Sequence, residues 1–171
     1  SGRDLKPWVS TWLQTAGVNT LRPELKISGD TYESVAILQE APLVPKGSHD
    51  LRPHRLKVGL FELKNAELVR RKSIELDVSG PSTSVSDLNG EKVADLLLIN
   101  DGDLSFAKIR LDDRSIATIK KHLGSLRDNL ARALCWSAAW DMLRDAELSA
   151  SDFIDVAIAG LAGEDDIITI T

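Results

Sequence analysis

The sequence predicts an α+β fold, in which an antiparallel β-sandwich is followed by an incomplete α-helical layer. Two observations lead to this prediction. Within residues 24–112, apolar and polar residues alternate in several short stretches, as in strands that bury one face and leave the other in water. From residue 113 on, the apolar residues take up the spacing of a helix. We therefore divide the chain into a terminal helix at 1–23, a sandwich at 24–112 and the beginning of a helical domain at 113–171.

A short helix is expected over residues 5–16. Trp8, Trp12 and Leu13 are spaced i, i+4 and i+5, which places them on one face of a helix. Gly17 is a suitable stop, because glycine readily takes the positive φ that often ends a helix. A helix of this length is not stable alone, so we expect it to pack against another part of the protein.

The strands are predicted from strict alternation, which is clearest at residues 34–37, 56–60 and 73–78. The dipeptides Asn89-Gly90 and Asp101-Gly102 lie between apolar stretches, and both favour the positive φ angles of a type I′ hairpin turn. Several short strands joined by such turns are typical of a β-sandwich.

Three helices are expected in the last part of the chain. The first ends at Gly124, the second covers about 126–147, and the third covers 151–161. Either Ser149 or Ser151 is expected to cap the third helix, because a serine side chain can accept a bond from a free N–H of the first turn.

The long helix carries apolar residues nearly all round between 130 and 143, which indicates a helix inside a helical stack. The acidic run 164–166 is expected to open a further helix, since carboxylates are favourable at a helix N-terminus. The apolar residues of 167–171 then close the sequence. We expect from this ending that the helical layer continues in a longer protein.

The composition restricts the class of protein. The chain has 21 Lys and Arg against 26 Asp and Glu, a formal net charge of −5, and 43% of its residues are hydrophobic. Global disorder is excluded, and the acidic balance leaves no electrostatic footprint for nucleic acid. No apolar stretch reaches the roughly 18 residues of a membrane span, and no secretory signal opens the chain. We expect a soluble, cytoplasmic protein that binds neither nucleic acid nor membrane.

No metal site is predicted in this chain. Its histidines are His49, His54 and His122, and none belongs to a His-Glu-x-x-His pattern, which would place two imidazoles and a carboxylate on one helical face. His49 and His54 fall in the proline-rich stretch around 41–53, which is expected to be a surface loop between strands. This pair could in principle bind a metal, but exposed loop histidines are the more common case.

No nucleophile is predicted either. Cys135 lies in the apolar helix, where a buried thiol acts as a small hydrophobic group with a raised pKa. Ser82, Ser84 and Ser86 lie in a polar stretch that we expect to be exposed, and no G-x-S-x-G elbow surrounds them.

The acidic residues have structural interpretations. Asp101 and Asp103 flank Gly102, but the oxygen ligands that a calcium loop needs do not follow, so a turn is expected. Asp112 and Asp113 precede a helix and are expected to cap it. Charges of both signs at 141–147 indicate a solvated or ion-paired helix face.

Aromatic pairs and one basic cluster complete the candidates. The tryptophans Trp8/Trp12 and Trp136/Trp140 are each spaced i, i+4, and could stack on a ligand, but such pairs more often form a core or a seam between domains. The cluster at 70–72 is expected to protect the edge of a sheet with its charge. The residues by themselves therefore predict no catalytic, cofactor-binding or metal-binding residue in this chain.

Three stretches, taken together and in this order, resemble the aminopeptidase N family of actinobacterial type. They are residues 12–24 (WLQTAGVNTLRPE), 97–112 (LLINDGDLSFAKIRLD, in which Asn100 and Arg110 match the family) and 132–147. The resemblance covers essentially the whole chain. It implies the last helix of a catalytic domain at 1–23, a β-sandwich linker domain at 24–112, and the start of a C-terminal helical domain at 113–171.

The resemblance also implies a parent enzyme that uses zinc to remove N-terminal residues from peptides. The zinc-binding and substrate-binding motifs of the family, and its catalytic tyrosine, belong to the catalytic domain and are not found here; the only tyrosine, Tyr32, lies in the strand region. We therefore expect a non-catalytic structural fragment without zinc of its own. Its expected partners are the missing catalytic and C-terminal helical domains and, through the parent, peptide substrates.

An alternative function belongs to another class of protein. The chain could be a stand-alone binding module for a peptide or a carbohydrate, with the tryptophan pairs or the loop at 41–53 as its contact surface. A module of this kind should have a closed surface, whereas a fragment should expose apolar patches.

Overall fold

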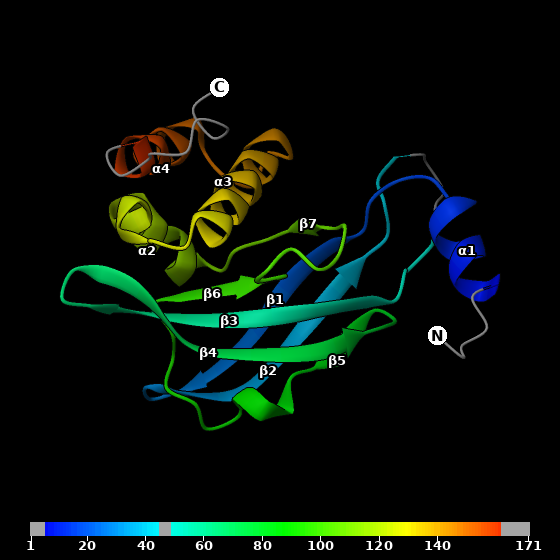
Figure 1. The fold of residues 1–171 in the computed structure, drawn as a ribbon, viewed down its shortest axis with the longest axis horizontal. Coiled ribbons are helices and arrows are strands. Elements are labelled where there is room, and N and C mark those ends of the chain that lie inside the picture. Colours follow the sequence, from blue (N-terminus) through cyan, green and yellow to red (C-terminus); the bar gives the residue numbers. More distant parts are fainter. Residues whose placement is uncertain (1–5, 45–48, 162–171) are drawn as a thin grey trace.

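The structure, a computed structural model, describes residues 6–44 and 49–161. It confirms the predicted α+β class: two sheets are followed in the chain by three helices (Figure 1). The strands are β1 (Thr20–Ser28), β2 (Thr31–Glu40), β3 (His54–Lys64), β4 (Glu67–Val78), β5 (Ser82–Ser84), β6 (Leu96–Ile99) and β7 (Lys108–Ile109). The α-helices are α1 (Lys6–Leu13), α2 (Asp113–His122), α3 (Asn129–Arg144) and α4 (Ala150–Leu161).

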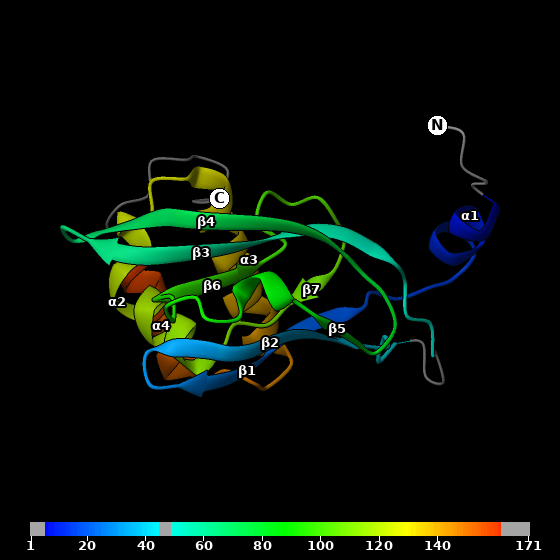
Figure 2. The ribbon, with the colours of Figure 1, turned by 90° about the horizontal axis from the view of Figure 1, so that it is seen from below.

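The two sheets face each other (Figure 2). Sheet A has the strand order β5-β2-β1-β7, and sheet B has the order β4-β3-β6. All described pairs are antiparallel except β1 and β7, which run parallel with Thr20 opposite Lys108 and Leu21 opposite Ile109. The prediction of an antiparallel sandwich is therefore wrong at this edge, because the chain leaves β6 in sheet B and crosses over to join sheet A.

Both predicted type I′ hairpins are wrong. Asn89 has a φ of −64° and follows the short 3₁₀ helix Ser86–Leu88, so only Gly90, with a φ of +80°, takes a left-handed conformation, as in a type II turn. The residues after β6 form the crossover between the two sheets, with positive φ at Asn100, Gly102 and Asp103. A dipeptide reports the local preference for positive φ but not which strands it joins.

The alternating residues form the core, as predicted. Leu56, Val58 and Leu60 on β3 are buried, and so are Val35 and Ile37 on β2. The first strand begins at Thr20 and pairs with β2 from there on, four residues before the expected start of the sandwich at residue 24.

Tyr32 is buried in the same core. Its hydroxyl accepts a hydrogen bond from the backbone N–H of Ala94 at 3.1 Å. Burial is the main reason that the pKa of this hydroxyl is raised above its ordinary value. Tyr32 therefore has a structural role between β2 and the segment that leads into β6.

The helix α1 confirms the predicted N-terminal helix, although it ends at Leu13 rather than at residue 16. It projects from the end of the sandwich opposite α2 and α4 (Figures 1 and 2). Gly17 has a φ of +94°, as expected of a helix stop, and a Cβ at this position would collide with the side chain of Pro42. The side chain of Trp8 lies outside the described residues.

The three later helices begin where polar side chains cap them. Asp112 accepts bonds from the backbone N–H groups of Arg114 and Ser115, which confirms its predicted capping role. Asp128 caps α3 through the N–H of Ala131. Ser149 rather than Ser151 caps α4, since its Oγ accepts from the N–H of Asp152 at 3.1 Å. Each helix is thus capped by a residue close to it in the sequence.

The apolar helix α3 is buried on one face only. Its buried face consists mainly of small residues, whereas Leu130 is 46% exposed and Trp140 is 49% exposed. Within the described residues, one face of α3 is therefore packed as predicted, and the other face is exposed. The sequence features predicted at 164–166 and 167–171 lie outside the described residues. No helix within the described ranges is long and apolar enough to span a membrane.

Candidate functional site

The cysteine is buried and the three serines are exposed, as expected. Cys135 is fully buried on α3, and burial raises the pKa of its thiol to about 12, so it stays protonated at neutral pH. Ser82, Ser84 and Ser86 are exposed around β5. Cys135 is therefore part of the packed interior, and the three serines belong to the surface.

The histidines take three different positions. His49 is exposed, as predicted, and His122 ends α2. His54 is only 2% exposed, so the expectation of an exposed loop histidine is wrong for this residue. It begins β3, its ring lies edge-on to Trp12 at 5.3 Å between centroids, and its Nδ1 lies 2.6 Å from Ser105 Oγ.

The described residues do not fit a zinc ion. Between residues 6 and 44 and between 49 and 161, no three His, Cys, Asp or Glu side chains converge into a group that could hold a metal. Zinc in proteins takes three or four such ligands. The site of interest in this part of the chain is therefore not a metal centre but a set of buried charges at two junctions.

The first junction joins α1 to the sandwich through Arg52. Arg52 is only 4% exposed. Its guanidinium donates from Nε to Thr11 O at 3.1 Å, from Nη1 to Gly17 O at 2.6 Å, and from Nη2 to Thr15 O and Oγ1 at 3.1 and 2.7 Å. It also lies 5.5 Å from the ring centroid of Trp12. Arg52 therefore satisfies carbonyl groups at the C-terminal end of α1, where the helix dipole favours a cation.

The backbone of Arg52 is fixed as firmly as its side chain. Its N–H donates to Asn19 Oδ1 at 3.2 Å, and its carbonyl accepts from Gln39 Nε2 at 2.7 Å. Asn19 Nδ2 in turn donates to the carbonyls of Glu40 and Asp50. The expected surface loop at 41–53 is thus wrong for its last part, which is an internal connection between α1, β1 and β2.

Replacing Arg52 by Met should release α1 while leaving the rest of the fold intact. The variant keeps an apolar stem but loses every donor to the end of the helix, and α1 projects from the end of the sandwich (Figure 1). We expect cleavage of residues 6–17 by chymotrypsin to accelerate by about tenfold or more, with little change in global unfolding. Arg55→Met, on the exposed face of β3, is the matched control. Equal cleavage of both variants would contradict this role of Arg52.

The second junction joins sheet A to the end of α3 through Arg110. This side chain is only 2% exposed; Nε donates to Glu147 Oε1 at 2.8 Å, and Nη2 pairs with Asp145. Lys108 Nζ also binds Asp145, at 3.0 and 2.7 Å, and Arg22 Nη1 binds Glu147 Oε2 at 2.8 Å. Cations from β1, β7 and the residue after β7 thus hold two carboxylates that follow α3.

The cations at this junction lower the pKa values of the two carboxyl groups that they bind. Hydrogen bonds from Lys108 and then from Arg110 hold the pKa of Asp145 below its ordinary value. Burial alone would raise the pKa of Glu147, but the bonds from Arg22 and Arg110 keep it lower than usual. Both carboxylates therefore stay ionised at neutral pH, which confirms the ion-paired reading of the helix charges at 141–147 for this end of the segment.

A third contact joins sheet B to the start of α3. Arg70 on β4 forms a two-bond pair with Asp101 at 2.7 and 2.8 Å, contacts Asp128 at 2.6 Å, and lies 5.0 Å from the ring centroid of Phe61. Asp101 is buried, so it is an ion-pair partner rather than a calcium ligand. β4 is an edge strand, as predicted for the basic cluster at 70–72, but Arg70 also links the sheet to the helices.

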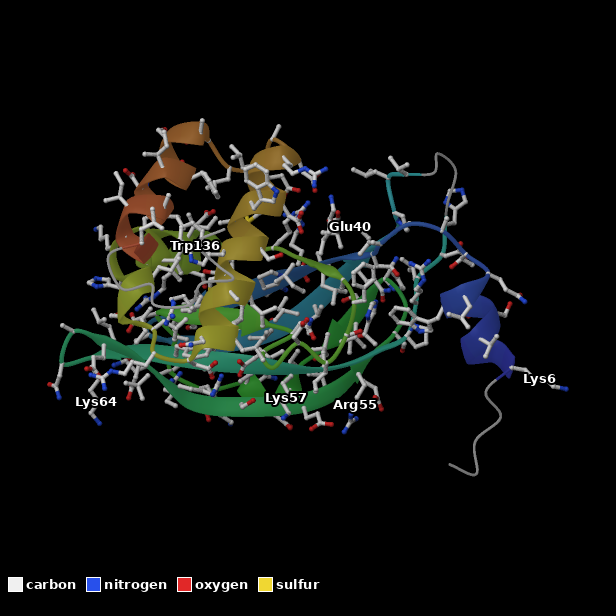
Figure 3. The ribbon with its side chains drawn as sticks, turned by 45° about the horizontal axis from the view of Figure 1, so that its top comes forward. Lys6, Glu40, Arg55, Lys57, Lys64 and Trp136 are labelled. Carbon is white, nitrogen blue, oxygen red and sulfur yellow. The ribbon has the colours of Figure 1, made fainter. Side chains whose placement is uncertain are left out.

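The second tryptophan pair packs between two helices of the predicted helical domain, and not at a seam between domains. Trp136 and Trp140 both contact Phe153 of α4, with ring centroids 6.3 and 5.6 Å apart. In Figure 3, Trp136 lies on the side of α3 that faces α2 and α4. A Cβ at Gly160 would collide with the Trp136 ring, so α4 needs a glycine at this contact.

Sequence reasoning missed both arginine junctions. Arg110 and Asn100 match the family pattern, but the pattern assigns them no role; in the structure Asn100 is buried with a φ of +62° and exchanges hydrogen bonds with the backbone of Ser105. The only feature of the sequence that sets Arg52 apart is its positive charge within a proline-rich stretch. The partners of these residues lie far away in the sequence, so no local pattern reveals them.

Comparisons with known proteins agree with the resemblance. Residues 96–171 match the family described as ERAP1-like C-terminal domain. Over 172 aligned residues the chain is 49% identical to aminopeptidase N of Streptomyces lividans, a match that takes 98% of this chain and 20% of that protein. The family match begins at β6 and includes all three later helices.

Proposed function

We propose that this chain, a homologue of one fifth of an aminopeptidase N, braces the helical C-terminal region of a zinc-dependent aminopeptidase that removes N-terminal amino acids from peptides. In this proposal the chain does no chemistry itself. The observation that carries it is the 49% identity across 98% of the chain, in a stretch whose described residues do not fit a metal. Zinc would be held by another part of the longer protein.

The charged contacts support a bracing role. Arg110 ties sheet A to the end of α3, and Arg70 ties sheet B to its start. Ser115 Oγ on α2 also accepts a bond from the N–H of Leu97 on β6. A helix held at both ends by two different sheets cannot rotate without breaking these ion pairs. The loss is most costly at Arg110, which is itself buried.

The first experiment tests the absence of chemistry in this chain. We expect the chain alone to contain no stoichiometric zinc by elemental analysis and to leave leucine p-nitroanilide uncleaved. One zinc per chain, together with hydrolysis that a chelator abolishes, would refute the proposal.

The second experiment tests the brace in a longer protein. In Streptomyces lividans aminopeptidase N, the matching fifth is replaced by this chain, and a control lacks that fifth altogether. We expect the chimera to keep its zinc and to hydrolyse the reporter peptide bond, while the deletion variant loses hydrolysis because nothing positions its helical region. A folded chimera without activity would count against the proposed role.

A further inference from the structure

A groove of about 490 Å³ lies between α3 and the crossover that follows β6. Its wall is largely apolar, with Ile109 and Ala138 buried at the base and Leu134 half-buried beside them. Two larger side chains at the groove are left in water: Phe106 is 73% exposed and Leu130 is 46% exposed. A groove with an exposed aromatic side chain of this size is a typical contact surface for another polypeptide.

The groove also carries negative charge that the described residues do not neutralise. Asp103 and Asp141 both line it, and neither has a Lys, Arg or His within ion-pair distance in the ranges that the structure covers. Within the described part of the chain, the Asp103 carboxylate accepts its side-chain hydrogen bond from Asn100 Nδ2, at 3.2 Å. Lys108 lines the groove as well, but its ammonium group is already bound by Asp145.

One wall of the groove is held in place before any partner arrives. Asn100 and Asp103 keep positive φ angles of 62° and 52°, an unusual conformation for residues other than glycine. The side chain of Asn100 holds it by bonding both the N–H and the carbonyl of Ser105. A preformed wall lowers the entropy cost of binding.

We propose that this groove binds a segment of the longer aminopeptidase N-like protein in which an apolar side chain lies next to a Lys or Arg. The apolar side chain would cover Phe106 and Leu130, and the cation would pair with Asp103 and Asp141. The inference rests on the proposed function. An intramolecular source is favoured because the matched relative is five times longer than the match, and because Val18, just after α1, lines the same groove.

Hydrogen exchange can show whether the groove is covered. Amide exchange over residues 103–108 and 130–141 is compared between the chain alone and the chimera described above. We expect these amides to exchange about tenfold more slowly in the chimera, since covered segments open less often. Amides on β2, which contributes no residue to the groove and is separated from β7 by β1, should exchange alike in both proteins.

Variants then test the chemistry of the contact. In the chimera, Phe106→Ser and the double variant Asp103→Asn with Asp141→Asn should each reduce the added protection. Glu33→Gln, which changes an exposed carboxylate on β2, should not. In the chain alone, Phe106→Ser should leave the melting temperature nearly unchanged, because this side chain is exposed; this separates lost docking from lost folding.

Each outcome bears on the proposal. Equal exchange in the two proteins, or full protection in both groove variants, would overturn it. Protection that appears in the chain alone at high concentration, with a dimer in light scattering, would also overturn it and assign the groove to a second copy. A protected groove in an inactive chimera would support the docking site and refute the proposed function.

Discussion

Replacing Arg110 by Met is expected to lower the free energy of unfolding by about 3 kcal/mol, because it removes the buried cation between sheet A and the end of α3. Arg110 is buried and bonds both Asp145 and Glu147. Met has a similar length but no donor, so both carboxylates lose one charged hydrogen bond within a partly buried site. Urea unfolding followed by circular dichroism at pH 7 would measure the change.

Arg22→Met is the matched control for this prediction. Arg22 binds the same Glu147, but its side chain is 34% exposed. Ion pairs of exposed groups contribute about 1 kcal/mol or less, so we expect a small change. If the two variants lost equal stability, burial of Arg110 would not be the reason for its effect.

The stability of this protein is expected to fall between pH 6.5 and pH 4 because of His54. Burial, and then the charge of Arg52, lowers the pKa of this ring from 6.5 to about 4. Among the described residues Nε2 has no hydrogen-bond partner, so a proton there would be both buried and unpaired. The neutral ring is therefore the form that the folded protein keeps.

The direction of this effect follows from which state binds the proton. Between pH 6.5 and 4 the unfolded chain takes up a proton at His54 and the folded chain does not, so acid favours unfolding. The contribution is complete above pH 6.5 and is lost as the pH falls toward 4; it amounts to at most about 3 kcal/mol. The carboxylates of Asp145 and Glu147, whose pKa values are lowered, lose their contribution at more acidic pH.

Unfolding measured from pH 7 to pH 4 in three proteins would test this prediction. The wild type should lose stability across the interval, and His54→Gln should lose clearly less, since glutamine does not titrate. His49→Gln, at an exposed position, should follow the wild type. Parallel curves for the wild type and His54→Gln would show that His54 is not the group responsible.

The parts of the fold that sequence reasoning predicted depend on short-range patterns. Alternation along β3 predicted a buried face because side chains of a strand point to opposite sides at every step. Asp112 was predicted as a cap, and Ser149 as one of two candidates with Ser151, because a cap bonds N–H groups only two or three residues away. Cys135 was predicted to be buried by the apolar residues that surround it in one helix.

The failures have a common physical cause. Asp101-Gly102 was expected in a hairpin, but β6 pairs with β3 and β7 with β1, in different sheets. His54 was expected in water, but β3 begins at this residue and its ring meets Trp12 on another element. Each of these outcomes depends on a segment that is distant in the sequence, and no local preference encodes it.

The sequence alone is therefore enough to recognise strands, helices and caps, because each depends on residues that are neighbours in the chain. It is also enough to recognise the relationship to aminopeptidase N, because identical residues match along almost the whole chain. The roles of Arg52 and Arg110 are visible only in the tertiary structure. An arginine on its own is as compatible with solvent as with the interior, and its place depends on whether distant carbonyls or carboxylates converge on it once the sheets and helices have packed.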